Sequence, residues 1–552
     1  MFTTRSRRRG GPRGHRRPLA VKTSVLAAAA AVLAAGVFVA LPGDADAVTP
    51  ARADFDGDGT SDLVYRNLEG RLYVNTGTAE TMALDADVAR VKDVLTPGDL
   101  DSDGVQDVLT LSAGGALRVH PGLYARTPGG LGSYRTVATG WQIYNKIAAP
   151  GDLNRDGRAD LVARTPAGTL YFYPGKGTGA FGGRVQIGTG WQQYDELIGA
   201  GDLDGDGDGD LLARTPAGVL YRCTGRGGGT FDARAKDPRT DWASYSQIIG
   251  GGDWDGNGTT DLLARDFSGA LWFHPGDGKG TFGTRSARSR GWGQVTQFAG
   301  AGNNPHFGKY GIMARTSAGS VYGYRVTGTG TLTGKELVGP AAWPPSTTRL
   351  AYASSLRDVG LADLVVHSVS TGRLSNPAYY ALSDPEIAGG STSYGRILGP
   401  GDLTGDGKGD LLSVTTSGTV YLNAGNGSGT SVAARVQVAT GWQAYDALVS
   451  GGDFTGDGRP DVLARDTSGT LWRLTGTGSA SAPFSARVRI GTGWQQYRRL
   501  FSPGDANGDG HADLMATSSS GALYLFAATG TGTFKPRATK ATTGWSVWTD
   551  LL

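Results

Sequence analysis

Eight short loops of the chain carry aspartates at a spacing that suits a metal ion. Their shared pattern is D-x-[DNT]-x-[DN]-G-x-x-D, in which positions 1, 3, 5 and 9 carry side-chain oxygens and position 6 is always glycine. The loops begin at Asp54, Asp99, Asp152, Asp202, Asp253, Asp402, Asp453 and Asp505. Carboxylates crowded this closely repel one another strongly unless a cation lies between them.

Calcium is the cation that this donor set suits best. Ca²⁺ takes six to eight oxygen ligands at about 2.3–2.6 Å, whereas Mg²⁺ demands a stricter octahedral geometry. Zinc would want His or Cys, and neither recurs as a ligand in these loops. An Asp-Gly turn that binds nothing is the alternative, but eight copies keep the donors and the glycine in register. The loops therefore predict about eight Ca²⁺ sites.

Each predicted site uses positions 1, 3, 5, 7 and 9 of its loop. Position 7 varies freely, which indicates that it offers its backbone carbonyl rather than its side chain. The predicted ligands are Asp54, Asp56, Asp58, Thr60, Asp62; Asp99, Asp101, Asp103, Val105, Asp107; Asp152, Asn154, Asp156, Arg158, Asp160; Asp202, Asp204, Asp206, Asp208, Asp210; Asp253, Asp255, Asn257, Thr259, Asp261; Asp402, Thr404, Asp406, Lys408, Asp410; Asp453, Thr455, Asp457, Arg459, Asp461; and Asp505, Asn507, Asp509, His511, Asp513. The two loops with threonine at position 3 carry fewer charges and should bind more weakly.

The loops mark a repeat of roughly 50 residues, a period typical of propellers and other repeat arrays. Two eroded copies, near Asn303 and Ser355, bring the total to ten units and lack the ligands for a metal. Within one unit, residues 191–231, short apolar strands alternate with the acidic loop and with glycine turns. The chain is therefore predicted to be an all-β protein, a β-propeller built from about ten four-stranded blades.

The ends of the repeat array predict how it closes. The first unit begins almost directly at its acidic loop, and the last segment, GWSVWTDLL, breaks off before any loop. Pairing such a segment with the incomplete unit removes exposed sheet edges. Ten blades are many for one ring, so we expect two five-bladed propellers, residues 48–300 and 301–552, the first closed by residues 291–300. One large ring is the alternative.

Residues 1–47 read as a secretory signal, with a basic start, an apolar run and Ala45-Asp46-Ala47 at its end. Ala51-Arg52-Ala53 is a second candidate cleavage site, and a retained membrane anchor is the alternative. Removing the signal leaves 45 of the 53 basic and 48 of the 50 acidic side chains, a net charge of about −3. Without a net positive charge, the sequence does not favour a nucleic-acid partner. We expect a secreted, extracellular protein without membrane contact after cleavage.

The acidic loops and the strands that follow them, as in DLNRDGRADLVAR and DFTGDGRPDVLAR, resemble the FG-GAP/VCBS-type calcium-loop repeats of the integrin α-subunit head and of related secreted bacterial propellers. The resemblance covers roughly residues 51–552. It implies a propeller fold and bound calcium. It is less specific for a ligand, because members bind proteins or glycans.

A second element, GW-x-x-Y, precedes most loops. Its tryptophans include Trp141, Trp191, Trp242, Trp442 and Trp494. Flat aromatic faces could form a sugar-stacking platform, one for each blade. The alternative, which the sequence favours, is a wedge that packs one blade on the next, because the tryptophan also recurs in the units that have lost their acidic residues.

The sequence offers little for catalysis. The histidines share no repeat position, and there is no G-x-S-x-G elbow or phosphate-binding loop. Asp195, Glu196 and Asp446 are acidic residues outside the loops, in a repeated segment that suggests a structural role. We therefore expect a non-catalytic, calcium-binding protein that recognises an extracellular glycan or cell-surface polymer. The alternatives are a protein-adhesion module and a polysaccharide hydrolase or lyase.

Overall fold

The computed structural model describes residues 52–552 apart from 68–70, 78–79, 83–90, 113, 123–130, 166, 195, 216–217, 267, 302–308, 310, 340–341, 355, 357–361, 378–385 and 430–434. The predicted signal, Asp195 and most of the two eroded loops lie outside these residues. The described residues contain no helix that is long and apolar enough to cross a membrane.

The described residues form ten antiparallel sheets of four strands each, as the sequence predicts. In the first half of the chain the sheets are β20 (Val295–Phe298), β1 (Leu63–Asn67), β2 (Leu72–Asn75), β3 (Glu80–Met82); β4 (Val91–Gly98), β5 (Asp107–Ser112), β6 (Leu117–His120), β7 (Arg135–Ala138); β8 (Lys146–Gly151), β9 (Asp160–Arg164), β10 (Leu170–Tyr173), β11 (Val185–Gly188); β12 (Glu196–Gly201), β13 (Asp210–Arg214), β14 (Leu220–Cys223), β15 (Ala235–Lys236); and β16 (Tyr245–Gly252), β17 (Asp261–Asp266), β18 (Leu271–His274), β19 (Ser286–Ser289).

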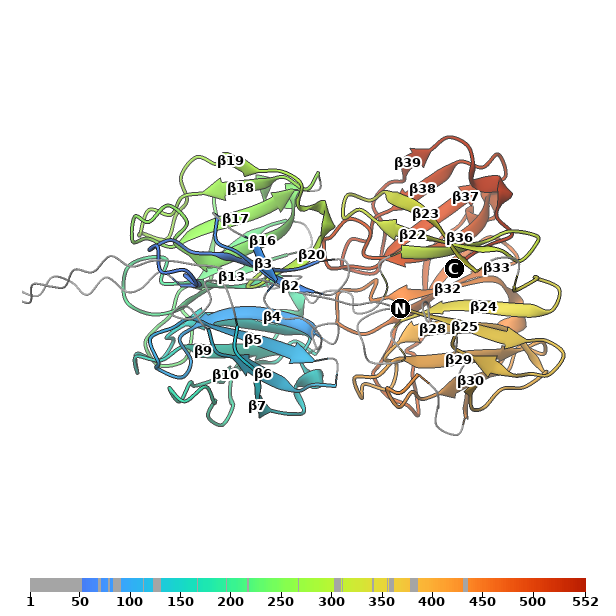
Figure 1. Cartoon of the computed structure of the whole chain (residues 1–552), viewed down its shortest axis with the longest axis horizontal. Coiled ribbons are helices and arrows are strands. Elements are labelled where there is room, and N and C mark those ends of the chain that lie inside the picture. Colours follow the sequence, from blue (N-terminus) through green and yellow to red (C-terminus); the bar gives the residue numbers. More distant parts are fainter. Residues whose placement is uncertain are drawn as a thin grey trace, which may run out of the picture. The chain divides into compact units, whose positions relative to one another are not determined.

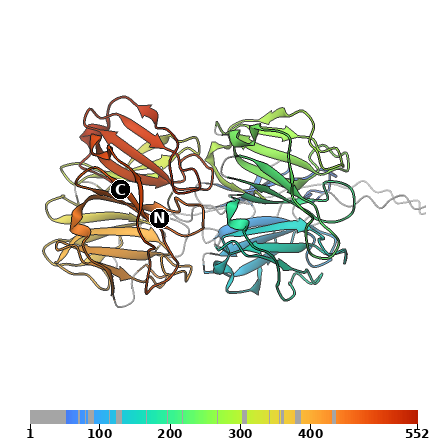
Figure 2. The same cartoon turned by 180° about the vertical axis from the view of Figure 1, so that it is seen from behind.

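The second half repeats this arrangement. Its sheets are β23 (Leu332–Gly339), β22 (Val321–Val326), β21 (Gly311–Arg315), β40 (Asp550–Leu551); β24 (Thr348–Ala353), β25 (Asp363–Ser368), β26 (Leu374–Ser375), β27 (Glu386–Ile387); β28 (Tyr394–Gly401), β29 (Asp410–Thr415), β30 (Val420–Asn423), β31 (Val436–Ala439); β32 (Tyr445–Gly452), β33 (Asp461–Asp466), β34 (Leu471–Leu474), β35 (Val488–Gly491); and β36 (Tyr497–Gly504), β37 (Asp513–Ser518), β38 (Leu523–Phe526), β39 (Ala538–Ala541). Strands such as β16 to β19 lie side by side as one small sheet (Figure 1), and the same grouping is seen from behind (Figure 2).

Two strand pairings join parts that are far apart in the sequence. Strand β20 pairs with β1, with Phe298 opposite Tyr65, and β40 pairs with β21, with Leu551 opposite Ala314. These are the pairings that the sequence predicts for the segments 291–300 and GWSVWTDLL. The last strand in each half of the chain thus completes the first sheet of that half.

Burial changes steadily across each sheet. The second strand is buried on both faces, as in β13 and β33, whereas the fourth strand is exposed or half-buried, as in β11 and β19. The apolar residue at position 10 of each acidic loop is the first or second residue of the buried second strand. These residues, which are less than 9% exposed, are Leu63, Val108, Leu161, Leu211, Leu262, Leu411, Val462 and Leu514. Because the position-10 side chain enters the core, it fixes the acidic loop at the end of that strand.

Eight apolar clusters each join two successive sheets. In one cluster, Leu170 and Phe172 of the third sheet pack with Leu197 and Leu211 of the fourth. Two further clusters return to a starting sheet. Ile249 and Leu263 pack with Leu63 and Tyr65, and Phe501 and Met515 pack with Ile312 and Ala314.

Glycine allows the first strands of neighbouring sheets to approach closely. A Cβ atom placed on Gly199 in β12 would lie 2.0 Å from the carbonyl oxygen of Ala149 in β8. Any larger residue would therefore push these two strands apart. By their contacts, residues 49–552 group as a single unit, so the two halves are distinguished by strand pairing and packing.

Candidate metal centres

The first aspartate of each acidic loop organises the loop backbone. In the fourth loop, Asp202 Oδ1 accepts the N–H of Gly205 at 2.7 Å and Oδ2 accepts the N–H of Gly207 at 2.9 Å. The bond from the position-6 glycine to the position-1 carboxylate is present in all eight loops. Its donors are Gly59, Gly104, Gly157, Gly207, Gly258, Gly407, Gly458 and Gly510. These glycines have φ between 80° and 88°, a conformation that other residues rarely adopt.

The ninth residue of each loop ties the loop to the sheet beneath it. Asp210 Oδ2 accepts the N–H of Leu203 at 2.8 Å, and its Oδ1 accepts the N–H of Gly225 at 2.8 Å. The bond to the position-2 N–H recurs in all eight loops. Its acceptors are Asp62, Asp107, Asp160, Asp210, Asp261, Asp410, Asp461 and Asp513. All eight side chains are buried.

In the seven loops with aspartate at position 5, this residue keeps one oxygen free of its bond to the position-7 backbone. Asp58 Oδ1 accepts the N–H of Thr60 at 2.8 Å, and the same bond from position 7 to position 5 recurs in every loop. A carboxylate has two oxygens, so the second oxygen of a position-5 aspartate is left for another partner. The carbonyl ligand predicted at position 7 stays a prediction.

Four of the loops bring three carboxylates together. Their ligand oxygens lie within 4.8 Å of one another, and the sets are Asp54, Asp56, Asp58; Asp99, Asp101, Asp107; Asp202, Asp204, Asp206; and Asp253, Asp255, Asp261. All four belong to the first half of the chain. The loops that begin at Asp152, Asp402, Asp453 and Asp505 carry Asn or Thr at position 3 and so bring fewer charges together.

Several of these oxygens are buried without a hydrogen-bond partner among the described residues. They are Asp62 Oδ1, Asp101 Oδ1, Asp107 Oδ1 and Asp204 Oδ1. A buried anionic oxygen without a partner is costly, and a hard cation bound to several such oxygens removes that cost. The oxygen donors predicted from the sequence thus have the chemistry that Ca²⁺ prefers. The structure adds that several of them are buried, close together and without a hydrogen-bond partner among the described residues.

Burial and mutual repulsion act on the same carboxylates. Burial, followed by the neighbouring loop carboxylates, raises the pKa of Asp62 and of Asp107 to about 7. Burial is also the main cause that raises the pKa of Asp210 to about 7 and that of Asp261 to about 6. Without a cation, these loops therefore hold carboxylates that resist ionisation near neutral pH.

The tryptophans that were considered for a sugar platform pack in the interior. Trp242 is fully buried, and Trp141, Trp442 and Trp494 are at most 9% exposed, so these four present no open face to a sugar ring. Each lies within 6.5 Å, between ring centroids, of a phenylalanine from a glycine turn, and Trp191 pairs with Phe231 in the same way while half-buried. This burial supports the packing role.

The backbone at these tryptophans also forms hydrogen bonds between neighbouring sheets. Most of the tryptophans open a short 3-10 turn, such as η3 (Trp191–Gln193), and the Trp191 N–H donates to Gly168 O in the preceding sheet at 3.0 Å. Arg164, at the end of β9, donates from Nη1 to Trp191 O at 2.8 Å and to Tyr194 O at 2.5 Å. This arginine was not predicted from the sequence, although it recurs at the end of the buried second strand, as at Arg214 in β13.

The acidic residues considered for catalysis pair with these arginines. Glu196 lies 2.9 Å from Arg214 Nε, and Asp446 Oδ1 accepts from Arg465 Nε at 2.8 Å. The Glu196 side chain is fully buried, and its Oε1 accepts the N–H of Ile248 in the next sheet at 2.9 Å. Glu196 therefore links two blades, whereas Asp446 pairs with an arginine of its own blade.

These features define a class of protein: an all-β repeat protein of four-stranded propeller blades with a recurring aspartate-glycine loop. Residues 152–213, 402–464 and 453–516 match the family model of the FG-GAP-like repeat. These three segments are FG-GAP-like repeats, which confirms for them the resemblance seen in the sequence. No match was found among curated proteins.

Some solved structures are similar at low identity. A lectin of Agrocybe aegerita that recognises non-reducing terminal N-acetylglucosamine is 14% identical, with 88% of this chain and 91% of that chain covered and a TM-score of 0.20. The BP39L lectin of Burkholderia pseudomallei is 13% identical over 73% of this chain and 99% of that chain, with a TM-score of 0.23. Sqt1 of Saccharomyces cerevisiae is 12% identical over 73% of this chain and 87% of that chain, with a TM-score of 0.24. At these TM-scores the ligands of those proteins do not bear on this chain.

Proposed function

We propose that this chain is a secreted, non-catalytic, calcium-binding propeller protein that recognises an extracellular ligand, a glycan or another cell-surface polymer. The observation that carries the calcium proposal is the shared hydrogen-bond frame of the eight loops, which leaves buried carboxylate oxygens such as Asp62 Oδ1 and Asp204 Oδ1 without a partner. Side-chain oxygens at positions 1, 3, 5 and 9 and the carbonyl at position 7 would hold the ion.

Calcium in this proposal supplies positive charge and does no chemistry on a substrate. The position-1 and position-9 aspartates fix the loop through backbone N–H bonds, as Asp202 and Asp210 do. Burial, and after it the repulsion of neighbouring carboxylates, raises the pKa of Asp62 and Asp107, and the ion would offset both. It should therefore stabilise the blades by a free energy that grows with the logarithm of the ratio of free Ca²⁺ to its dissociation constant.

We also propose that the chain forms two five-bladed propellers, residues 48–300 and 301–552. The pairings of β20 with β1 and of β40 with β21 support this division. The two clusters that return from the last sheet to the first sheet of each half support it as well.

Differential scanning calorimetry tests the calcium proposal. We expect Ca²⁺ at a hundredfold excess over its dissociation constant to stabilise the fold by about 3 kcal/mol for each site, relative to protein in chelator. Mg²⁺ at the same concentration is the control, and it should give a smaller shift because of its stricter geometry. A thermal midpoint that is the same in calcium and in chelator would refute the proposal.

Retention of the mature protein on insoluble polysaccharides and cell walls tests the ligand proposal, first with calcium and then with chelator. Calcium-dependent retention supports recognition of a polymer. Retention only by a protein-bearing surface would favour an adhesion module, and release of reducing ends would favour a polysaccharide-active enzyme. Because the tryptophans are buried, the contact surface is to be sought among exposed side chains of the outer strands, such as Val185, Val436 and Val488.

A further inference from the structure

One arginine departs from the pattern of the acidic loops. Arg155 stands at position 4 of the third loop, where six other loops have glycine: Gly57, Gly205, Gly256, Gly405, Gly456 and Gly508. Its φ is 61°, so the loop keeps the left-handed turn that the glycines adopt at the same place. A non-glycine residue pays for this conformation in backbone strain, which directs attention to what its side chain does.

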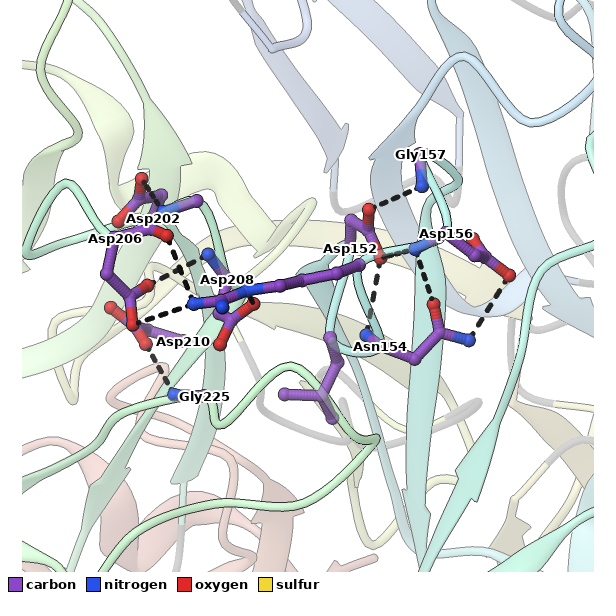
Figure 3. A network of polar contacts seen from close by, with 12 residues as sticks. Asp152, Asn154, Asp156, Gly157, Asp202, Asp206, Asp208, Asp210 and Gly225 are labelled. Carbon is purple, nitrogen blue, oxygen red and sulfur yellow. Dashed lines mark hydrogen bonds and ion pairs between the residues drawn. The ribbon is translucent and has the colours of Figure 1, made fainter.

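The Arg155 side chain leaves its own loop and reaches the next one. Its Nε donates to Asp208 Oδ1, and its Nη2 lies 3.2 Å from Asp206 O and 3.5 Å from Asp206 Oδ2. Figure 3 shows the two loops facing each other, with Asp152, Asn154 and Asp156 on one side and Asp202, Asp206, Asp208 and Asp210 on the other. A guanidinium from one candidate metal centre therefore lies on the carboxylates of its neighbour.

Asp208 makes the fourth loop the most acidic of the eight. It adds a fifth carboxylate at position 7, its side chain is fully buried, and its Oδ2 has no hydrogen-bond partner among the described residues. A buried carboxylate needs a counter-charge, and Arg155 supplies it.

Asp206 is the residue where the arginine and a metal ion would meet. Its Oδ1 accepts the N–H of Asp208 at 2.9 Å, which is the bond that every loop makes at position 5. Its Oδ2 is then the oxygen that remains for a metal ion, and Arg155 Nη2 lies beside it. In the first loop, Asp58 Oδ1 accepts from Thr60 in the same way, and no arginine from another loop pairs with Asp58 among the described residues.

We propose that Arg155 is a tethered cation of the fourth loop that competes with a divalent ion for Asp206 and so sets the affinity of that site. The inference rests on the proposed calcium function. When an ion binds the fourth loop, Arg155 gives up Asp206 and keeps Asp208. Because the backbone of Arg155 is part of the third loop, ion binding at the third or the fourth loop affects ion binding at the other.

The test follows the fourth and the fifth loop separately, by hydrogen exchange with mass spectrometry during a Ca²⁺ titration of the full chain. Peptides that cover residues 202–210 report on the fourth loop, and peptides that cover residues 253–261 report on the fifth. Arg155→Met keeps a side chain of similar length and the same backbone demand but removes the charge, whereas Arg155→Lys keeps the charge. Arg373→Ala is the control, because it removes one charge from an exposed pair with Glu386 in the other half of the chain.

We expect Arg155→Met to lower the Ca²⁺ midpoint of the fourth loop roughly two- to fivefold, the size expected for one partly exposed charge pair. The fifth loop should not change. Arg155→Lys and Arg373→Ala should stay near the wild-type midpoint, and added salt should shrink the difference. An unchanged or raised midpoint in Arg155→Met overturns the inference alone. A wild-type protein in which neither loop responds to Ca²⁺ overturns the proposed function and this inference with it.

Discussion

The first and ninth residues of each acidic loop do different things because they lie at different depths. The first carboxylate gathers backbone N–H groups of the loop itself, as Asp202 does with Gly205 and Gly207. The ninth is buried and binds the position-2 N–H. In one eroded copy this second bond survives, because Asp363 Oδ2 accepts the N–H of Leu356 at 2.7 Å. The ninth aspartate is therefore part of the blade as well as a candidate ligand.

A buried histidine gives a prediction about acid stability. His274 is fully buried, stacks on Trp242 at 4.9 Å between ring centroids, and has no hydrogen-bond partner on either ring nitrogen among the described residues. Burial, followed by the charge of Arg239, lowers the pKa of His274 to about 3, with Asp241 acting in the opposite direction and Arg285 in the same one. His274 therefore becomes protonated near pH 6.5 in the unfolded chain but stays neutral at that pH in the folded chain.

Stability from His274 is thus fully present above pH 6.5 and is lost as the pH falls toward 3. At pH 5 the loss amounts to about 2 kcal/mol. His274→Phe removes this titration. Between pH 7.5 and pH 5, the free energy of unfolding of the wild type should therefore fall by about 2 kcal/mol relative to that of the variant. Urea unfolding of both proteins at the two pH values measures it, and parallel pH profiles would contradict the prediction.

At the scale of strands and turns, an arginine near the end of the buried second strand links five of the blades to the next. Arg164, Arg214, Arg265, Arg315 and Arg465 all donate to the carbonyl of a tryptophan that opens the following turn. Their Nε atoms face a polar side chain of their own sheet, such as Asn145 or Asp446. The link therefore uses both the backbone of one blade and the side chains of another.

Breaking this link should be costly where the partner is a buried acid. Arg214→Met leaves Glu196 buried without its counter-charge, so we expect the free energy of unfolding to fall by about 3–5 kcal/mol. Adding Glu196→Leu should restore most of it. The matched control is Arg226→Ala, whose pair with Asp232 is exposed on both sides and should be worth less than about 1 kcal/mol. Equal losses for Arg214→Met and the control, in urea unfolding, would contradict this account.

The sequence predicts the blades well because their signals are local. Aspartates and a glycine at fixed spacing, followed by Leu or Val, specify both the loop and the buried strand, and the structure has them in register in eight copies. The arginine link could not be assigned from sequence, since its acceptors lie 27 to 30 residues away at Trp191 and Tyr194. The reach of Arg155 to Asp208, 53 residues on, depends on blade packing in the same way.

At the scale of the whole chain, the closing strands explain why the repeat begins and stops mid-unit. Tyr65 in β1 finds its partner Phe298 only after four further sheets have been built, and Ala314 in β21 finds Leu551 in the same manner. Each half thus ties its last strand to its first. The start of the first half also carries residues that are part of the packing.

Arg52 is built into the first half of the chain. Its Nε donates to Thr96 O in β4 at 2.9 Å, its Nη2 donates to Ala149 O in β8, and a Cβ atom on Gly251 in β16 would lie 2.7 Å from its Nη1. The neighbouring Ala53 is buried, and its carbonyl accepts the N–H of Asp62 at 2.8 Å. The Arg52 hydrogen bonds connect the start of the fold to the first strands of two other sheets, and its Nη1 lies close to the first strand of a third.

Cleavage within Ala51-Arg52-Ala53 would remove these contacts, so we predict that the exported protein begins before Arg52, at Val48. The N-terminal sequence of the exported protein tests this directly, and a start at Asp54 would contradict it. Recombinant chains that begin at Val48 and at Asp54 give the energetic counterpart. The shorter chain leaves the carbonyls of Thr96 and Ala149 and the N–H of Asp62 without these partners, at about 1–3 kcal/mol for each buried group left unsatisfied. Its thermal midpoint should therefore be several degrees lower in calcium and in chelator alike, because the loss lies in the sheets and not in the loops.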